Sequence, residues 1–172
     1  DPEWTAFLTD AGLRAFEEQP LRPAVPLNGA ARPEGFDAWL KTNVYRQRQP
    51  GYYTATVRLT LGDLTAGQLR ALADLARRFT RETVRTTVEQ NIILRWVAEA
   101  DLLELYQGLK PIGLGQAGAG TIVDVTSCPG TDTCKLGIAS SRGLGGELSQ
   151  RQAAQSHTLD EAVQGLHIKI SG

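Results

Sequence analysis

Residues 51–110 constrain the fold of this chain most strongly, because strand and helix patterns alternate within them. Residues 52–60 alternate Tyr, Val and Thr side chains, which favours a β-strand. Residues 83–89 and 92–97 are two further β-rich runs, joined around Gln90-Asn91. The sequence therefore predicts three strands in this segment, the last two of which are consecutive.

Two amphipathic helices separate and follow these strands. A Gly62-Asp63 turn precedes Thr65, which can cap a helix. The apolar side of this helix is predicted at Leu69, Leu72, Ala76 and Phe79. The second helix, before a stop at Gly113, is predicted to bury Leu102, Leu105, Tyr106 and Leu109. The order β-α-β-β-α predicts an α+β fold that matches most of a ferredoxin-like split βαβ unit.

Composition places the chain among ordinary globular proteins and excludes several classes of function. The net charge of −1 gives no electrostatic basis for binding nucleic acid or an anionic membrane. No apolar run approaches the roughly 20 residues that span a bilayer. Two cysteines in 172 residues make no disulfide framework, so we expect a cytoplasmic protein. Because the chain contains no methionine, we expect Asp1 to be an internal boundary.

Changes in composition divide the chain into three parts, residues 1–35, 36–114 and 115–172. The first part contains an amphipathic stretch, residues 4–16, and then four prolines whose spacing excludes a helix or a central strand. We expect it to be a linker that wraps a neighbour. In the last part we expect a strand over residues 121–125, a helix over residues 135–148, partly helical residues up to 165 and a final strand ending at Gly172.

Cys128 and Cys134 form a C-x5-C pair in the loop TSCPGTDTC, where Pro129 and Gly130 bend the chain. A helix that starts beside such a loop offers free N–H groups and a positive dipole end, which suit a thiolate. Neither His157 nor His167 has a zinc-type spacing to the cysteines, which makes zinc unlikely as the metal. Taken alone, a C-x5-C pair is a weak pattern that favours the interpretation as two incidental thiols over cluster ligands.

The loop occurs with three other segments in a characteristic order: NVYRQRQPG (43–51), VRTTVEQN (84–91) and HIKISG (167–172). Together they resemble the sirohaem and [4Fe–4S] nitrite and sulfite reductases over roughly residues 36–172. The resemblance implies that Cys128 and Cys134 supply two cluster thiolates, and that a C-x3-C pair expected directly after Gly172 supplies the others. VRTTVEQN resembles the second of two ferredoxin-like halves, with Glu89 where the first half has an arginine. We therefore expect a C-terminal-half fragment that ends within the cofactor-binding domain.

The resemblance also implies a set of cofactor-binding residues. Guanidinium and amide groups bind carboxylates well, and sirohaem carries eight carboxylates. The residues expected to face the sirohaem cleft are Arg46, Gln47, Gln49, Thr87, Gln90 and Asn91. For the arginines of this part of the chain, Arg46, Arg48 and Arg58, the alternative is an ordinary surface charge. Asp124 and Asp132 are interpreted as loop or capping residues, and we expect no catalytic residue in this chain.

The implied parent enzyme reduces nitrite to ammonia or sulfite to sulfide with six electrons, taken from a donor such as ferredoxin. The substrate-binding basic residues are expected in a first half of the enzyme, outside this chain. We expect the isolated chain to hold neither cofactor and to be inactive, with the Cys128 loop and residues 149–172 as its least ordered parts. Two alternatives remain at this point: a precorrin-3B synthase within the same family, and a non-catalytic ferredoxin-like binding module.

Overall fold

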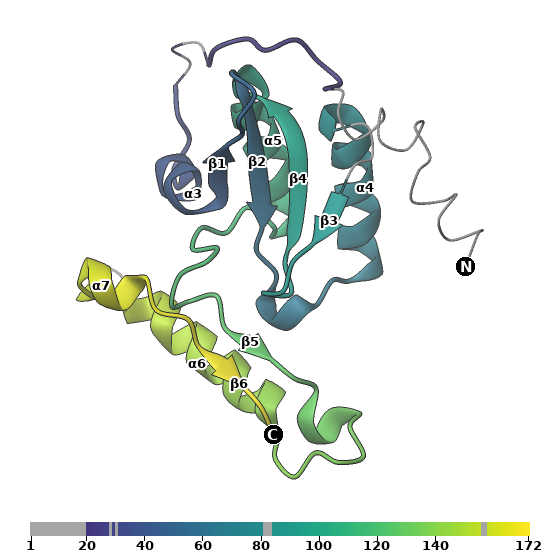
Figure 1. The fold of residues 1–172 in the computed structure, drawn as a ribbon, viewed down its shortest axis with the longest axis vertical. Helices are drawn as coiled ribbons and strands as arrows, with labels where there is room; N and C mark the ends of the chain where they lie inside the picture. Colours follow the sequence, from purple (N-terminus) through teal and green to yellow (C-terminus); the bar gives the residue numbers. More distant parts are fainter. Residues whose placement is uncertain (1–19, 28, 30, 81–83, 156–157) are drawn as a thin grey trace.

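The computed structural model describes residues 20–27, 29, 31–80, 84–155 and 158–172. The predicted amphipathic stretch, residues 4–16, lies outside them. The described part folds into a four-stranded sheet with three helices, followed by a smaller region that contains the cysteines (Figure 1). No described helix has the length and apolar character needed to cross a membrane.

The sheet consists of β1 (Val44–Arg46), β2 (Tyr52–Val57), β3 (Val84–Thr86) and β4 (Ile92–Ala98), in the spatial order β1-β2-β4-β3. All three pairings are antiparallel. Consequently β2 and β3, which α4 (Ala66–Thr80) connects, run parallel with β4 inserted between them. This is the predicted split βαβ arrangement, and it confirms the α+β fold. Strand β1 was not predicted, because its residues belong to the polar NVYRQRQPG segment, which forms this strand and a hairpin turn.

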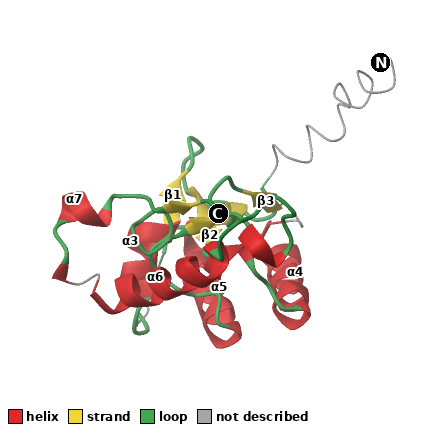
Figure 2. Cartoon of the chain, turned by 90° about the horizontal axis from the view of Figure 1, so that it is seen from below, coloured by secondary structure: helices red, strands yellow, loops and turns green. Residues whose placement is uncertain are grey.

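Helices α3 (Phe36–Asn43), α4 and α5 (Leu102–Leu109) cover one face of the sheet (Figure 2). The aromatic rings of Phe36, Trp39 and Tyr106 lie 5.3–6.0 Å apart and join α3 to α5. The predicted core positions of both amphipathic helices are buried, with the exception of Leu69, whose side chain is 54% exposed. Leu69 lies in the first turn of α4, at the edge of the short strand β3, where there is too little sheet to cover it.

Short 3₁₀ helices connect these elements: η1 (Thr60–Gly62), η2 (Glu99–Asp101) and η3 (Lys110–Ile112). The described proline-rich residues pack along the edge of the same unit. The Arg22 guanidinium contacts the Asp101 carboxylate at 2.9 Å, and the Arg22 carbonyl accepts a hydrogen bond from the Tyr52 hydroxyl. The Val25 carbonyl accepts a hydrogen bond from the Ala100 N–H. The segment thus contacts its own domain.

The second region contains β5 (Thr126–Ser127), η4 (Gly130–Asp132), α6 (Ser141–Gln155), α7 (Glu161–Gln164) and β6 (Lys169–Ile170). Strands β5 and β6 pair in parallel and pack against α6 through the small residues Ser141, Gly145 and Ser149, which are buried at every fourth position. This close approach requires small side chains, because a Cβ on Gly145 would lie 2.8 Å from Leu61 and 3.3 Å from Ser127.

Two predicted elements of this region were wrong in their bounds. Residues 121–125 form turns instead of a strand, because the Thr121 N–H donates to the Gly118 carbonyl and the Asp124 N–H donates to the Thr121 carbonyl. Only residues 126 and 127 form a strand. The helix starts at Ser141 rather than near residue 135, because residues 134–140 fold back onto η4. There the Thr131 N–H donates to the Ala139 carbonyl. Gly137 packs so closely on Gly130 that a Cβ atom added to Gly137 would lie 2.6 Å from the Gly130 carbonyl carbon.

Candidate functional site

Cys128 lies directly after β5 and is partly buried. Its N–H donates to the Ile170 carbonyl, and its sulfur lies 3.3 Å from the Ser141 hydroxyl oxygen and 3.4 Å from the Gly172 nitrogen, which donates to it. The hydrogen bond with Ser141, followed by those with the backbone N–H groups of Gly172 and Gly130, lowers the pKa of Cys128 from 9.0 to about 7. Donors that converge on a sulfur favour its thiolate form, which is the form that binds metals.

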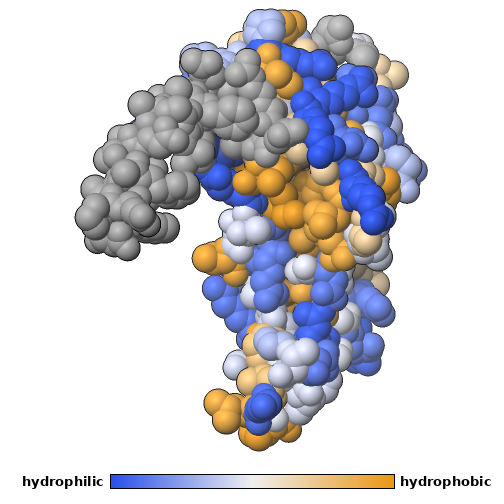
Figure 3. Space-filling view, turned by 90° about the vertical axis from the view of Figure 1, so that its right-hand side faces the viewer, coloured by the Kyte–Doolittle hydropathy of each residue, from blue (hydrophilic) through white to orange (hydrophobic). Residues whose placement is uncertain are grey.

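Cys134 is exposed and lies after η4, on the outer part of the same loop. Its N–H donates to the Gly130 carbonyl at 3.0 Å. Leu136 and Ile138 follow with side chains that are 89% and 93% exposed. The lower end of the molecule in Figure 3, which is the end formed by this loop in Figure 1, accordingly shows an apolar surface.

Arg142, in the first turn of α6, fixes the loop to the ferredoxin-like unit. Its guanidinium pairs with Asp63, donates to the Leu61 carbonyl at 3.2 Å and lies 3.5 Å from the Asp132 carboxylate. Asp132 stands between the two cysteines in the sequence, so this contact holds the middle of the cysteine loop. The sequence prediction that Asp132 is a loop residue did not identify this partner.

The turn between β3 and β4 makes a second connection to the cysteine segment. The Gln90 amide nitrogen donates to the Ser127 carbonyl at 2.8 Å, and its amide oxygen accepts from the Ser127 N–H at 3.2 Å. Asn91, which is 2% exposed, donates to the Asp124 carboxylate at 2.7 Å and accepts from the Leu59 N–H. Both side chains therefore connect the sheet to the segment that leads into Cys128.

Asp124 and Arg58 are charged groups buried at this boundary, with 2% and 8% of their surfaces exposed. Burial raises the pKa of Asp124, and the hydrogen bonds from Gly120 and Asn91 oppose this shift. Burial likewise lowers the pKa of Arg58, and the charge of Asp124 opposes it. The Arg58 guanidinium donates to the Val123 carbonyl and the Gln116 side chain. The sequence interpretation of Arg58 as a plain surface charge, which is the usual environment of an arginine, was therefore wrong.

The six residues expected to face a cofactor cleft lie in two groups at opposite ends of the sheet. The β1–β2 hairpin lies at the Tyr52 end of β2, which pairs with Ala98, and the β3–β4 turn lies at the Val57 end, which pairs with Ile92. The six residues of β2 therefore separate the two groups by about 20 Å. The hairpin group is Arg46, Gln47 and Gln49, and the turn group is Thr87, Gln90 and Asn91.

Most of these side chains have structural partners. Gln47 accepts from the Trp96 N–H at 2.7 Å and donates to Gln49, while the Thr87 hydroxyl accepts from the Glu89 and Asn91 N–H groups. Arg46 and Gln49 are exposed. The binding of a cofactor by these six residues stays a prediction, with Arg46 and Gln49 the most accessible of them.

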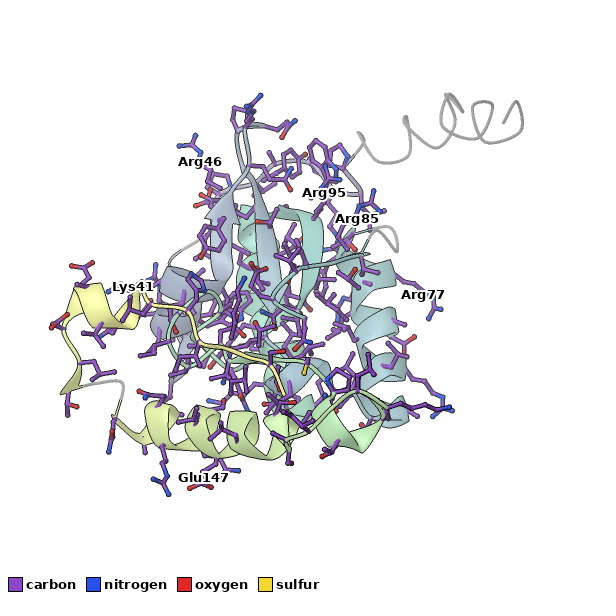
Figure 4. All side chains as sticks on the ribbon, turned by 60° about the horizontal axis from the view of Figure 1, so that its bottom comes forward. Lys41, Arg46, Arg77, Arg85, Arg95 and Glu147 are labelled. Carbon is purple, nitrogen blue, oxygen red and sulfur yellow. The ribbon has the colours of Figure 1, made fainter. Side chains whose placement is uncertain are left out.

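The face of the sheet opposite the helices carries further polar side chains that sequence reasoning did not select. Because Ala55 and Leu94 point into the core, strand alternation places Thr54 and Arg95 on the open face, and Arg85 shares it by pairing with Ile93. Figure 4 shows Arg85, on the edge strand β3, and Arg95, on the neighbouring strand β4, on the side of the sheet away from Arg46.

A cavity of about 240 Å³ also opens on this face, near the turn that contains Thr87. Its lining includes the hydroxyl groups of Tyr45, Thr54 and Thr56, the carboxylates of Glu89 and Asp124, and His167. These acidic groups disfavour carboxylates in the cavity itself. The positive charges of the open face lie beyond it, at Arg85 and Arg95.

The cysteine loop has the donor chemistry of half an iron–sulfur site. Thiolates are the usual ligands of a [4Fe–4S] cluster, and four are normally required. Within the described ranges, no three His, Cys, Asp or Glu side chains gather in a way that could hold a metal ion. Cys128 and Cys134 fit two of the four ligands, and the sulfur of Cys128 accepts a hydrogen bond from the Gly172 N–H.

Comparison with known proteins assigns the central domain. Residues 45–112 match the nitrite/sulfite reductase ferredoxin-like half domain. The fold is similar to that of the NirA protein of Mycobacterium tuberculosis, with a TM-score of 0.61 and 21% identity over 95% of this chain and 31% of that one.

Sequence relatives agree with this assignment. The chain is 30% identical to the assimilatory ferredoxin-dependent nitrite reductase of Haloferax mediterranei, over 93% of this chain and 29% of the relative. It is 31% identical to ferredoxin sulfite reductase 2 of Mycolicibacterium paratuberculosis, over 59% of this chain and 19% of that protein. The chain thus spans less than a third of either relative. With its half domain and its relatives in agreement, the chain belongs to the nitrite/sulfite reductase family.

Proposed function

We propose that the chain is the part of a sirohaem-dependent nitrite or sulfite reductase that contains the second ferredoxin-like half and two cluster ligands. The observation that carries the proposal is the environment of Cys128, whose sulfur accepts a hydrogen bond from the Gly172 N–H and lies 3.3 Å from the Ser141 hydroxyl oxygen. Such donors stabilise negative charge on a sulfur and tune the potential of a cluster bound to it. Cys128 and Cys134 would hold one side of a [4Fe–4S] cluster, which would supply single-electron transfer for the reduction of an oxyanion at a sirohaem.

The protein side of this function is the placement of two thiolates on a preformed loop. Cys128 is held by β6 and by the start of α6, and Cys134 is held by the backbone of η4. The chain has only these two cysteines, so the other two thiolates of a four-cysteine site come from outside the 172 residues. Ferredoxin is the proposed electron donor, since the Haloferax relative is named for its dependence on ferredoxin.

The proposal is tested on the full-length protein that contains this chain, by iron, acid-labile sulfide and the visible spectrum, together with nitrite and sulfite reduction. We expect Cys128→Ser and Cys134→Ser each to lose the cluster and both activities. Thr133→Ala is the matched control, because Thr133 is an exposed residue of the same loop. Full iron and sulfide in both serine variants would show that these cysteines are not ligands.

A further inference from the structure

The two hydrogen bonds between Gln90 and Ser127 replace the contact that a neighbouring strand would make. In an extended segment, successive backbone groups point to opposite sides. The N–H groups of Thr126 and Cys128 donate to the carbonyls of Ile168 and Ile170, on the β6 side. The N–H and carbonyl of Ser127 therefore face away from β6, where both are bound by the Gln90 amide. The segment that leads into Cys128 is thus held on one side by β6 and on the other side by Gln90.

The local structure around Gln90 directs its side chain toward this site. Gln90 has φ 64°, a left-handed conformation that is uncommon for a residue other than glycine. The turn is closed by hydrogen bonds between Thr87 and Asn91, and a Cβ on Gly62 would lie 3.1 Å from the Gln90 Cβ. A turn bonded in this way and packed against η1 limits where the Gln90 side chain can go. The Gln90 amide consequently meets the backbone of Ser127, a residue that is 1% exposed.

We propose that Gln90 is a positioning residue for Cys128: it fixes the backbone of Ser127 and thereby the direction in which the Cys128 thiolate points. This inference rests on the proposed function, in which Cys128 is a cluster ligand. It assigns Gln90 to the protein frame, because both polar atoms of its amide are already used by Ser127.

The experiment compares variants of this chain by two readouts. The first is the exchange of the Ser127 amide hydrogen, followed by NMR, and the second is the alkylation rate of Cys128 relative to Cys134 at one fixed pH. Gln90→Asn shortens the side chain and suits the left-handed backbone, so it removes both hydrogen bonds without new strain. Gln90→Glu keeps the length and the acceptor for the Ser127 N–H but loses the donor.

The matched control is Gln68→Asn. The Gln68 amide also joins two segments: it lies on α4, donates to the Ile112 carbonyl at 3.0 Å and accepts from the Thr65 N–H, and both partners lie outside the cysteine segment. Its shortening should lower the stability of the chain to a similar extent. It therefore separates a loss of positioning from a general loss of stability.

We expect Gln90→Asn to speed exchange at Ser127 about tenfold, the factor that corresponds to about 1.4 kcal/mol. The alkylation ratio of Cys128 to Cys134 should rise with it, Gln90→Glu should be intermediate, and Gln68→Asn should leave both readouts unchanged. Unchanged readouts in Gln90→Asn, or equal changes in Gln68→Asn, would overturn the proposal. If Gln90→Asn fails to fold, Gln90→Glu decides by the same two readouts.

A full-length protein that keeps its iron in both cysteine variants would refute the proposed function, whereas the exchange and alkylation readouts concern Gln90 alone.

Discussion

The ferredoxin-like unit and the cysteine region are held together by different means. The first has a continuous apolar core, in which Phe36, Trp39, Leu94 and Leu105 are completely buried. The second has no comparable cluster among its described residues: α6 packs through Ser141, Gly145 and Ser149, and polar bonds connect the region to the unit. The chain therefore combines a domain that is stabilised by burial with a segment that is ordered by contact with that domain.

The largest effect is expected from Leu105→Ala, in the core of the first region. Leu105 is fully buried on α5, so its truncation leaves a cavity and should lower the free energy of unfolding by about 2–5 kcal/mol. Leu136→Ala, in the exposed part of the cysteine loop, should change it by less than about 0.5 kcal/mol. Urea unfolding of both variants measures the contrast, and equal losses would contradict it.

Two neighbouring glycines of α6 test the close packing of the second region. Gly145→Ala places a Cβ 2.8 Å from Leu61 and 3.3 Å from Ser127, which should destabilise the chain by about 1–3 kcal/mol. Gly146→Ala meets Leu61 only at 3.9 Å and should stabilise the helix by about 0.5–1 kcal/mol. Thermal unfolding distinguishes the two signs. A stabilising Gly145→Ala would show that α6 is not packed as described.

Asp124→Asn tests the charge buried between the two regions. An asparagine oxygen can still accept from Asn91 and Gly120, while the charge is removed. Because burial raises the pKa of Asp124, the folded chain binds this proton more tightly than the unfolded chain. The Asp124 contribution to stability therefore increases as the pH falls through the folded pKa toward the unfolded value near 3.8. The variant should be at least as stable as the wild type at pH 7, and this difference should shrink on acidification. A difference that grows on acidification would contradict the direction of the shift.

The smallest effect is a shift in the reactivity of Cys128. Since its pKa is lowered to about 7, the rate of its alkylation should rise with pH and reach half its maximum near pH 7. Ser141→Ala removes the hydroxyl partner and should move the midpoint upward, toward the ordinary value of 9.0. Mass spectrometry of iodoacetamide-treated chain follows Cys128 separately from Cys134. An unshifted midpoint in Ser141→Ala would mean that the hydroxyl does not stabilise the thiolate.

The contrast between the regions also explains which parts of the structure were predictable from the sequence. Strand alternation and the helical spacing of Leu72, Ala76 and Phe79 directly report a buried face, so the β-α-β-β-α order of residues 51–110 was predicted correctly, whereas α3 and β1 were not predicted. Helix α6 buries only small residues and has no amphipathic pattern, so its bounds were missed by several residues.

The candidate site was predictable only in part. The sequence identified the cysteine pair by its resemblance to a family, and Gln90 and Asn91 as polar residues of interest. It did not identify their partners, because the contacts of Gln90 with Ser127 and of Asn91 with Asp124 join positions more than 30 residues apart. Such pairings depend on how the two regions dock, and no local pattern reports them.

Hydrogen exchange measured by mass spectrometry on the 172-residue chain tests the central claim most directly, because it reports the opening free energy of each region separately. We predict that peptides within residues 36–114 exchange only through global unfolding, while peptides around Cys128 and within residues 158–172 exchange through a smaller opening. Equal protection in the two regions, with both lost in one transition, would contradict the view that the cysteine region derives its order from the ferredoxin-like unit.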